Sequence, residues 1–214
     1  MENWVEDGWK RGLDARRSDA NYRQMSAALR KADIYVTPEE YLSGEMISGT
    51  KHEYLAGIIY AMAGASRSHN LLSGNISRSL GNQLAGKRCV PFGSDMRLRI
   101  HKPGATFYYY PDVTVDCSDS KDDEIDQPTV IFEVLSPSTD RGDRGDKLVN
   151  YQSLPSMRVY ALVDQFRMAV TVYRRGEGEA WTREFFSEAD ERVELPEIGC
   201  ALTLRAIYDR VFDE

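Results

Sequence analysis

Several features that often reveal a protein's class are scarce or missing from the sequence. It has only three cysteines, Cys89, Cys117 and Cys200, and neither a CxxC pair nor a histidine at zinc-ligand spacing, which argues against a zinc module. Their odd number and wide spacing predict free thiols in a reducing cytoplasm. The most apolar segment, residues 54–65, is shorter than the roughly 18 residues that a membrane helix needs. The N-terminus lacks the apolar stretch of a signal peptide, so we expect a cytoplasmic protein without a membrane role.

The composition is that of an ordinary globular domain. Hydrophobic residues make up 42% and charged residues 29% of the 214 residues, close to the averages for folded proteins. A chain of this length can bury a sizeable core but is short for two domains and a linker. Residues 1–32 are polar with weak helical patterning, and we expect them to form a helical extension to one domain over residues 33–214.

Charge is distributed unevenly along the chain. The net charge of −7 argues at first against nucleic acid, because phosphate binding depends on Lys and Arg. Between Gly64 and Pro111, however, seven basic residues face one acid, so this stretch carries +6 and the remainder −13. The stretch predicts either a local surface that engages phosphates or ordinary solvated faces of helices and strands.

Local signals mark two helices and a hairpin near the start of the domain. The Thr-Pro-Glu-Glu string that begins at Thr37 is typical of a helix start. Residues 51–63 are rich in Tyr and Ile around an Ala-Gly pair, which predicts a β-hairpin. Apolar residues then recur at every fourth position from Leu72, which predicts a helix with one apolar face, capped by Ser66 or Ser68.

The rest of the chain alternates between apolar segments and polar connections. Strands are expected at residues 89–100, 106–117, 129–135, 158–163, 169–174 and 181–186, and helices at 140–152 and 204–212. The middle of the chain therefore follows the order helix, three strands, helix, strand. We expect an α/β protein of the α+β kind, built on a mixed sheet.

Glu133 is the one charge in a continuous apolar run, residues 129–135. Such runs are typical of strands buried on both faces, where an unpaired carboxylate is costly. Asp112 opens the neighbouring strand candidate, and alternation places it on the face opposite Val113. If the two strands pair, the two carboxylates repel one another and a bound Mg²⁺ relieves the repulsion. The alternative is that Asp112 only caps a strand end.

Lys147 is the third candidate site residue. It shares one helical face with Tyr151, on the helix expected after the strand of Glu133. From there its ammonium could reach the same site and hold an attacking water or a phosphate. The competing interpretation is an exposed salt bridge between Asp143 and Lys147.

Longer strings of the domain carry a family resemblance. They are TPEEYL, KHEYLAGIIYAMAGASRSHN, SDMRLRI, YPDVTV and IFEVLSPSTDRGDRGDKLVNYQSLPSMRVYALVD, and they span the chain from about Thr37. In these strings the chain resembles the Uma2 family, also called DUF820, of the PD-(D/E)XK nuclease superfamily. The resemblance implies a restriction endonuclease-like α-β-β-β-α-β core with an added N-terminal hairpin and added C-terminal strands.

The resemblance also implies a set of active-site residues. Asp112 and Glu133 match the metal ligands of the family, with the carbonyl of Val134 as a third ligand. The lysine that the superfamily carries two residues after the acid is Leu135 here. In the family a lysine on the following helix is thought to substitute, which assigns this role to Lys147.

Glu53 and His69 match two further positions that recur near the family's site. His69 also precedes Leu72 by three residues, so it extends the apolar face of the expected helix. A buried core histidine with satisfied hydrogen bonds is an equally good interpretation of the same position.

The residues and the resemblance together predict a Mg²⁺-dependent endonuclease, with Mn²⁺ able to substitute. Its expected substrate is nucleic acid, and DNA rather than RNA. The alternative is a nuclease-fold protein that has lost catalysis and serves as a binding or assembly module. A cysteine-dependent enzyme is disfavoured, because no histidine lies near the thiols in sequence. Tyr108, Tyr109 and Tyr110 either pack against neighbouring strands or stack on bases. Several superfamily members act as dimers, so a homodimer is a further expectation.

Overall fold

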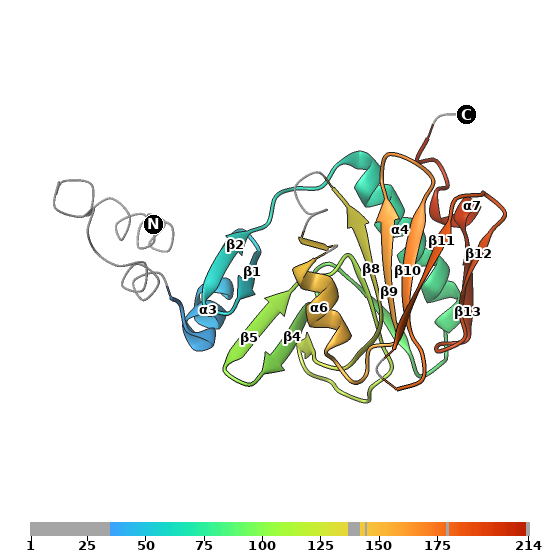
Figure 1. Cartoon of the computed structure of the whole chain (residues 1–214). Helices are drawn as coiled ribbons and strands as arrows, with labels where there is room; N and C mark the ends of the chain where they lie inside the picture. Colours follow the sequence, from blue (N-terminus) through green and yellow to red (C-terminus); the bar gives the residue numbers. More distant parts are fainter. Residues whose placement is uncertain (1–34, 137–141, 144, 179, 213–214) are drawn as a thin grey trace. The chain divides into compact units, whose positions relative to one another are not determined.

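The computed structural model describes residues 35–136, 142–143, 145–178 and 180–212, and Figure 1 shows the course of the chain. The chain divides into two compact units. The first holds the described residues up to Ala63 together with His101–Tyr108, and the second holds Gly64–Ile100 and the described residues from Tyr109 onward. The expected extension, residues 1–32, lies outside the described residues.

The first unit combines a hairpin, one further strand and a short helix. Its elements are α3 (Pro38–Glu45), β1 (His52–Leu55), β2 (Ile58–Ala61) and most of β5 (Ala105–Tyr109). Thr37 caps α3 in a reciprocal capping box with Glu40, as the Thr-Pro-Glu-Glu string predicts. β1 pairs with β2 across a turn in which Gly57 has a φ of 103°, a conformation that favours glycine. Tyr41, Tyr54 and Tyr108 form the core of this unit.

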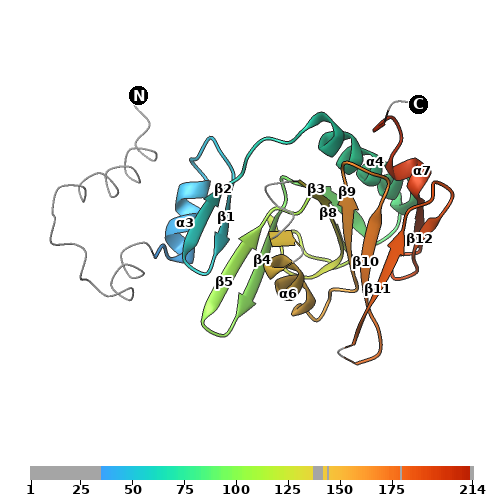
Figure 2. The same ribbon diagram turned by 45° about the horizontal axis from the view of Figure 1, so that its top comes forward.

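The second unit is built on a six-stranded mixed sheet with the strand order β11-β10-β9-β8-β6-β3. The strands are β3 (Val90–Gly93), β6 (Val113–Asp116), β8 (Pro128–Leu135), β9 (Val159–Asp164), β10 (Val170–Arg175) and β11 (Trp181–Phe186). β8 and β9 run parallel, and the other neighbours are antiparallel. Figures 1 and 2 show α4 (Arg67–Leu84) on one face of this sheet and α6 (Asp146–Gln152) on the other. The predicted α+β fold with a mixed sheet is confirmed.

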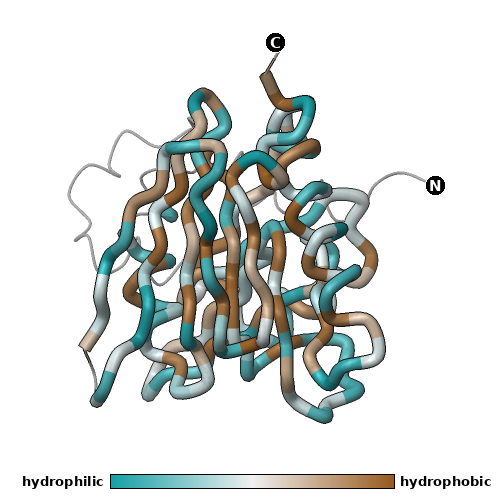
Figure 3. The backbone as a smooth tube through the Cα atoms, turned by 90° about the vertical axis from the view of Figure 1, so that its right-hand side faces the viewer, coloured by the Kyte–Doolittle hydropathy of each residue, from teal (hydrophilic) through white to brown (hydrophobic). Residues whose placement is uncertain are grey.

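The main core lies between α4 and the sheet. Leu72, Ile76 and Leu80 of α4 are fully buried, together with alternate valines of β6, β8 and β9. Burying each such side chain stabilises the fold by about 1.5–3 kcal/mol. Figure 3 shows the apolar stretches gathered on adjacent strands. Ser66 caps α4, and no helix in the described ranges is long and apolar enough to cross a membrane.

A C-terminal hairpin that the sequence pattern did not predict packs against α4. It consists of β12 (Arg192–Leu195) and β13 (Cys200–Thr203), and a short helix, α7 (Leu204–Ile207), follows. The Asn75 side chain donates hydrogen bonds to the carbonyls of Ile207 and Asp209. α7 is shorter than the helix expected at 204–212, because turns follow it from residue 208 onward.

Two predicted strands are each divided in the structure. The segment 89–100 splits into β3 and β4 (Arg97–Lys102) at a turn, and the segment 106–117 splits into β5 and β6 around Pro111, which has no N–H for a sheet. The acidic loop contains a short strand, β7 (Glu124–Ile125), which pairs in parallel with β4. α6 begins at Asp146, whereas the helix was expected from residue 140; of its expected first turns, residues 140, 141 and 144 lie outside the described residues.

The expectation of three free thiols is wrong, because Cys89 and Cys117 form a disulfide. The two residues flank β3 and β6, whose antiparallel register pairs Val90 with Asp116 and so brings the neighbouring cysteines opposite one another. Their separation of 28 residues in sequence concealed this contact. Cys200 alone is a free cysteine among the described residues, and it is buried.

We predict that thiol titration of the purified protein in denaturant, without reductant, finds one reactive thiol per chain. The physical reason is that only Cys200 carries a free sulfhydryl in the described fold. Replacing both bonded cysteines by serine should lower the free energy of unfolding by about 3–4 kcal/mol, since the bond closes a loop of 28 residues. Three reactive thiols per chain would contradict the disulfide and support the prediction from the sequence that all three cysteines are free.

Candidate functional site

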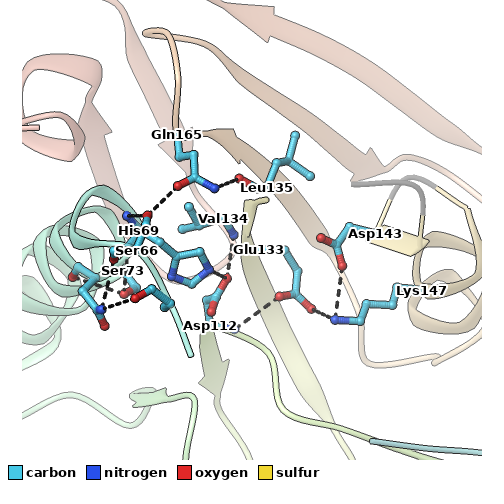
Figure 4. A network of polar contacts seen from close by, with 12 residues as sticks. Ser66, His69, Ser73, Asp112, Glu133, Val134, Leu135, Asp143, Lys147 and Gln165 are labelled. Carbon is cyan, nitrogen blue, oxygen red and sulfur yellow. Dashed lines mark hydrogen bonds and ion pairs between the residues drawn. The ribbon is translucent and has the colours of Figure 1, made fainter. Parts of the chain in front are cut away.

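Asp112 and Glu133 lie close together where the pairing of β6 with β8 ends. β6 begins at Val113, which pairs with Phe132 of β8, and Asp112 directly precedes β6, beside Glu133. The backbone N–H of Asp112 donates to Glu133 Oε2 at 3.4 Å, and the N–H of Val134 donates to Asp112 Oδ2 at 2.7 Å. Figure 4 shows the two carboxylates side by side. The strand pairing on which the sequence argument depends is confirmed.

Lys147 reaches Glu133 from α6. Its Nζ lies 3.1 Å from Glu133 Oε1 and 3.2 Å from Asp143 Oδ1, and all three side chains are buried. The hydroxyl of Tyr151, one turn further along α6, donates to the same Glu133 oxygen at 2.9 Å. The salt bridge between Asp143 and Lys147 that the sequence suggested does form. The expectation that it is exposed is wrong, because the pair is buried and shares Lys147 with Glu133.

His69 joins this cluster from the first turn of α4. Its Nε2 lies 3.2 Å from Asp112 Oδ2. Burial lowers the pKa of His69, but the hydrogen bond to Asp112 and the attraction of that carboxylate outweigh it and raise the pKa above its ordinary value. His69 is thus a partner of Asp112 rather than a histidine of the apolar core.

Gln165, which the sequence patterns did not single out, helps to fix this end of α4 to the sheet. The Gln165 amide donates to the carbonyl of Leu135 at 2.7 Å and accepts from the hydroxyl of Ser66 at 2.6 Å. The same hydroxyl accepts from the backbone N–H of His69. Gln165 is 5% exposed, and a buried amide directly after an apolar strand was the signal that could have revealed it.

Tyrosine side chains outside α6 pack against this helix. Tyr151 packs edge-on against both Tyr109 and Tyr160, and the Tyr160 hydroxyl donates to the carbonyl of Asp143. Asn150 donates to the hydroxyl of Tyr109. Tyr108, Tyr109 and Tyr110 are all buried, so the idea that they stack on bases is wrong and the packing interpretation holds.

The donor chemistry of the cluster fits a divalent cation. Within the described residues, no three side chains of His, Cys, Asp or Glu are grouped as metal ligands. Asp112 and Glu133 provide two carboxylates, and a backbone carbonyl such as that of Val134 could complete an oxygen set of the kind Mg²⁺ prefers. Three carboxylates, with that of Asp143, face one lysine and one histidine, so the cluster keeps a negative charge. Glu53 lies on β1 of the first unit, and its role stays a prediction.

Much of the basic stretch is engaged with acids. Arg97 and Arg99 on β4 both contact Glu124 of β7, at 3.4 and 2.6 Å. Arg88 pairs with Asp119, and Arg78 with Asp209. Four of the seven basic residues thus have a carboxylate partner, which favours the interpretation of ordinary helix and strand faces for these four.

Comparisons with known proteins identify the family of the chain. A model of the Uma2 family, described as "Putative restriction endonuclease", matches residues 38–206. Two uncharacterized proteins of Synechocystis are each 36% identical to the chain. One, slr1290, aligns over 81% of this chain and 91% of its own length, and the other, sll1609, over 68% and 84%. The chain therefore belongs to the Uma2 family, whose description is that of a nuclease, and the resemblance drawn from the sequence is confirmed.

A solved structure shares the fold. The crystal structure of a "putative nuclease belonging to DUF820" from Anabaena variabilis matches with a TM-score of 0.67, over 83% of this chain and 99% of that one. The two chains are 18% identical, so the likeness concerns the fold.

We predict that Lys147→Met lowers the free energy of unfolding by about 3–5 kcal/mol, because it leaves Glu133 and Asp143 buried without their shared cation. Urea denaturation at neutral pH measures the loss. The matched control is Lys121→Met at an exposed position, which should change stability by less than about 0.5 kcal/mol. A loss below about 1 kcal/mol for Lys147→Met would mean that the pair behaves like an exposed one.

Proposed function

We propose that this protein is a metal-dependent endonuclease that hydrolyses phosphodiester bonds of nucleic acid, with DNA as the expected substrate. The observation that carries the proposal is the pair Asp112 and Glu133, which are linked by backbone-to-carboxylate contacts where the pairing of β6 with β8 ends, with Lys147 beside Glu133. Membership in a family described as restriction endonucleases supports the same reaction class.

In this proposal Asp112, Glu133 and the carbonyl of Val134 would hold Mg²⁺, and Mn²⁺ could take its place. When bound, such an ion would supply Lewis-acid chemistry, polarising the scissile phosphate and lowering the pKa of a water molecule. The oxygen of that water forms the new bond to phosphorus while the bond to the 3′ oxygen breaks. The products are a 5′-phosphate and a 3′-hydroxyl: the attacking water gives up a proton to solvent, and a proton from solvent completes the leaving hydroxyl.

Lys147 supplies the fixed positive charge of the mechanism. Its ammonium orients the attacking water and offsets the charge that grows on the phosphate oxygens, a preorganised contribution. Asp143 and Tyr151 hold the lysine and its carboxylate partner in place. His69 orients the Asp112 carboxylate through the contact of 3.2 Å. Glu53 is kept as a further candidate on the strength of the family resemblance.

We predict that Glu133→Gln and Asp112→Asn each abolish cleavage of circular DNA, supplied in both single-stranded and duplex form, in Mg²⁺, because each removes one of the two charges that attract the ion. Gel analysis of nicked and linear products measures the activity. Glu194→Gln, at an exposed position on β12, is the matched control and should cleave like the wild type. Circular dichroism verifies that all three variants are folded, and cutting by the wild type in EDTA would refute the mechanism.

A second candidate function is a nuclease-fold protein without catalysis that serves as a binding or assembly module. One observation favours it: Lys147 pairs with Glu133 and His69 contacts Asp112, so each carboxylate has a nitrogen partner from the protein itself. In such a protein the cluster would only hold α4 and α6 on the sheet.

Calorimetric titration with Mn²⁺ separates the two functions. We predict binding at one or two sites per chain that weakens by at least about tenfold in Asp112→Asn, as expected when a carboxylate ligand is lost. Asp119→Asn, which changes an exposed acid paired with Arg88, should leave the affinity unaltered. Identical Mn²⁺ binding by wild type and Asp112→Asn would favour the module without catalysis.

A further inference from the structure

The sheet face that carries Glu133 continues across three more strands. Glu133 pairs with Leu162 on β9, Leu162 with Thr171 on β10, and Thr171 with Phe185 on β11. Directly paired residues point to the same side of a sheet, and neighbouring strands lie about 4.8 Å apart. Phe185 therefore stands on the face of the proposed site, about 14 Å from Glu133 along this row.

A hollow of about 200 Å³ opens on this face. It begins at Leu135, two residues beyond Glu133 on the same strand and therefore on the same face. Its further walls include Leu162, Thr171, Arg183 and Phe185, with Arg167 at its rim from the turn between β9 and β10.

The hollow adjoins the support of α6. Tyr151 on α6 packs against Tyr160, and Tyr160 stacks with Tyr173, which also lines the hollow. In Figures 1 and 2 α6 lies toward the β8 side of this face, and no helix of the described second unit covers β10 and β11 there. The cluster around Glu133 and the hollow thus share a wall of tyrosines.

The side chains at the open end of the hollow combine an aromatic ring with positive charge. Phe185 is 57% exposed, so its ring is accessible to a base. Arg183 is exposed, and the Arg167 side chain is 72% exposed although its Nε contacts Asp164 Oδ2 at 3.0 Å. Two guanidinium groups against one carboxylate leave a net positive charge, and guanidinium groups bind phosphate in forked pairs of hydrogen bonds.

We propose that this hollow binds one unpaired nucleotide of the substrate strand, with its base on Phe185 and its phosphates near Arg183 and Arg167. The volume is below the roughly 300–1,000 Å³ of ordinary ligand pockets, which suits a single base rather than a whole cofactor. Bases within a duplex are stacked on one another, whereas an unpaired base is free to stack on a protein ring. The proposal rests on the proposed function and adds single-stranded nucleic acid as the substrate class.

Binding is measured in EDTA on the full chain, by fluorescence anisotropy of a labelled twelve-thymidine strand and of a duplex of the same length. Phe185→Ala should weaken binding of the single strand by about tenfold and leave duplex binding unchanged. Phe185→Trp restores the stacking surface and should restore the affinity, whereas Phe185→Leu, which is apolar but not aromatic, should not. A twelve-uridine strand in a parallel titration distinguishes RNA from DNA.

The salt dependence tests the cationic wall. Arg183→Ala should reduce the slope of log affinity against log salt concentration by about 0.7, the value for one phosphate contact on a single strand. Arg205→Ala is the matched control, because Arg205 is exposed on α7 and pairs with Asp190, and it should leave the slope unchanged.

Unaltered single-strand binding in both Phe185→Ala and Arg183→Ala would overturn the proposal, as would an equal loss of duplex binding or no measurable binding of either single strand by the wild type. These results are independent of the cleavage assay. Both proposals are supported if Glu133→Gln loses cleavage and the Phe185 variants change single-strand affinity as predicted. If cleavage depends on Glu133 but the Phe185 variants bind the single strand like the wild type, only the hollow is rejected. If the single strand binds through Phe185 but the wild type cleaves nothing, only the nuclease is rejected.

Discussion

The buried carboxylate of Glu133 is the constraint on which the arrangement of the second unit depends. β8 is apolar on both faces, so a charge in its middle is stable only with close partners. Glu133 obtains them from three places: the ammonium of Lys147, the hydroxyl of Tyr151 and the backbone N–H of Asp112. Two of these donors lie on α6, which is only seven residues long and too short to be stable by itself. The requirement of one carboxylate therefore helps to hold a helix against the sheet.

The next two residues of β8 anchor the opposite helix. The N–H of Val134 binds Asp112, which also contacts His69, and the carbonyl of Leu135 binds Gln165, which reaches Ser66 at the cap of α4. Consecutive residues at the end of one strand thus connect to α6 on one side and to the start of α4 on the other. A nuclease site needs side chains held within a fraction of an ångström, and hydrogen bonds to rigid elements on both sides of the sheet provide that rigidity.

Local patterns predicted those parts of the structure that depend on neighbours in sequence. The period of four from Leu72 gave α4 and its buried face, and a lone charge in an apolar run marked Glu133. Features that depend on how distant segments pair or pack were not predicted. The disulfide of Cys89 requires β3 beside β6, and the burial of Lys147 requires α6 to pack on the face of Glu133. The division of two long strand candidates escaped as well, although Pro111 was a visible reason for one of them, and the C-terminal hairpin has too short a pattern to be recognised alone.

The departure from the superfamily pattern at Leu135 gains a physical meaning from the sheet. A lysine at that position would share the face of Glu133 and place its ammonium toward the side where the hollow begins. Here the ammonium comes from α6, on the side of Asp143, and Leu135 presents an apolar side chain to the hollow instead. If both proposals hold, the position of the charge on the helix separates two tasks: α6 and the strand ends supply charge for the reaction, and the uncovered part of the sheet face is left for a base. If the hollow binds as proposed, Leu135→Lys combined with Lys147→Met would recover a positive charge near Glu133. The new side chain would, however, lie where the hollow begins and obstruct the bound nucleic acid.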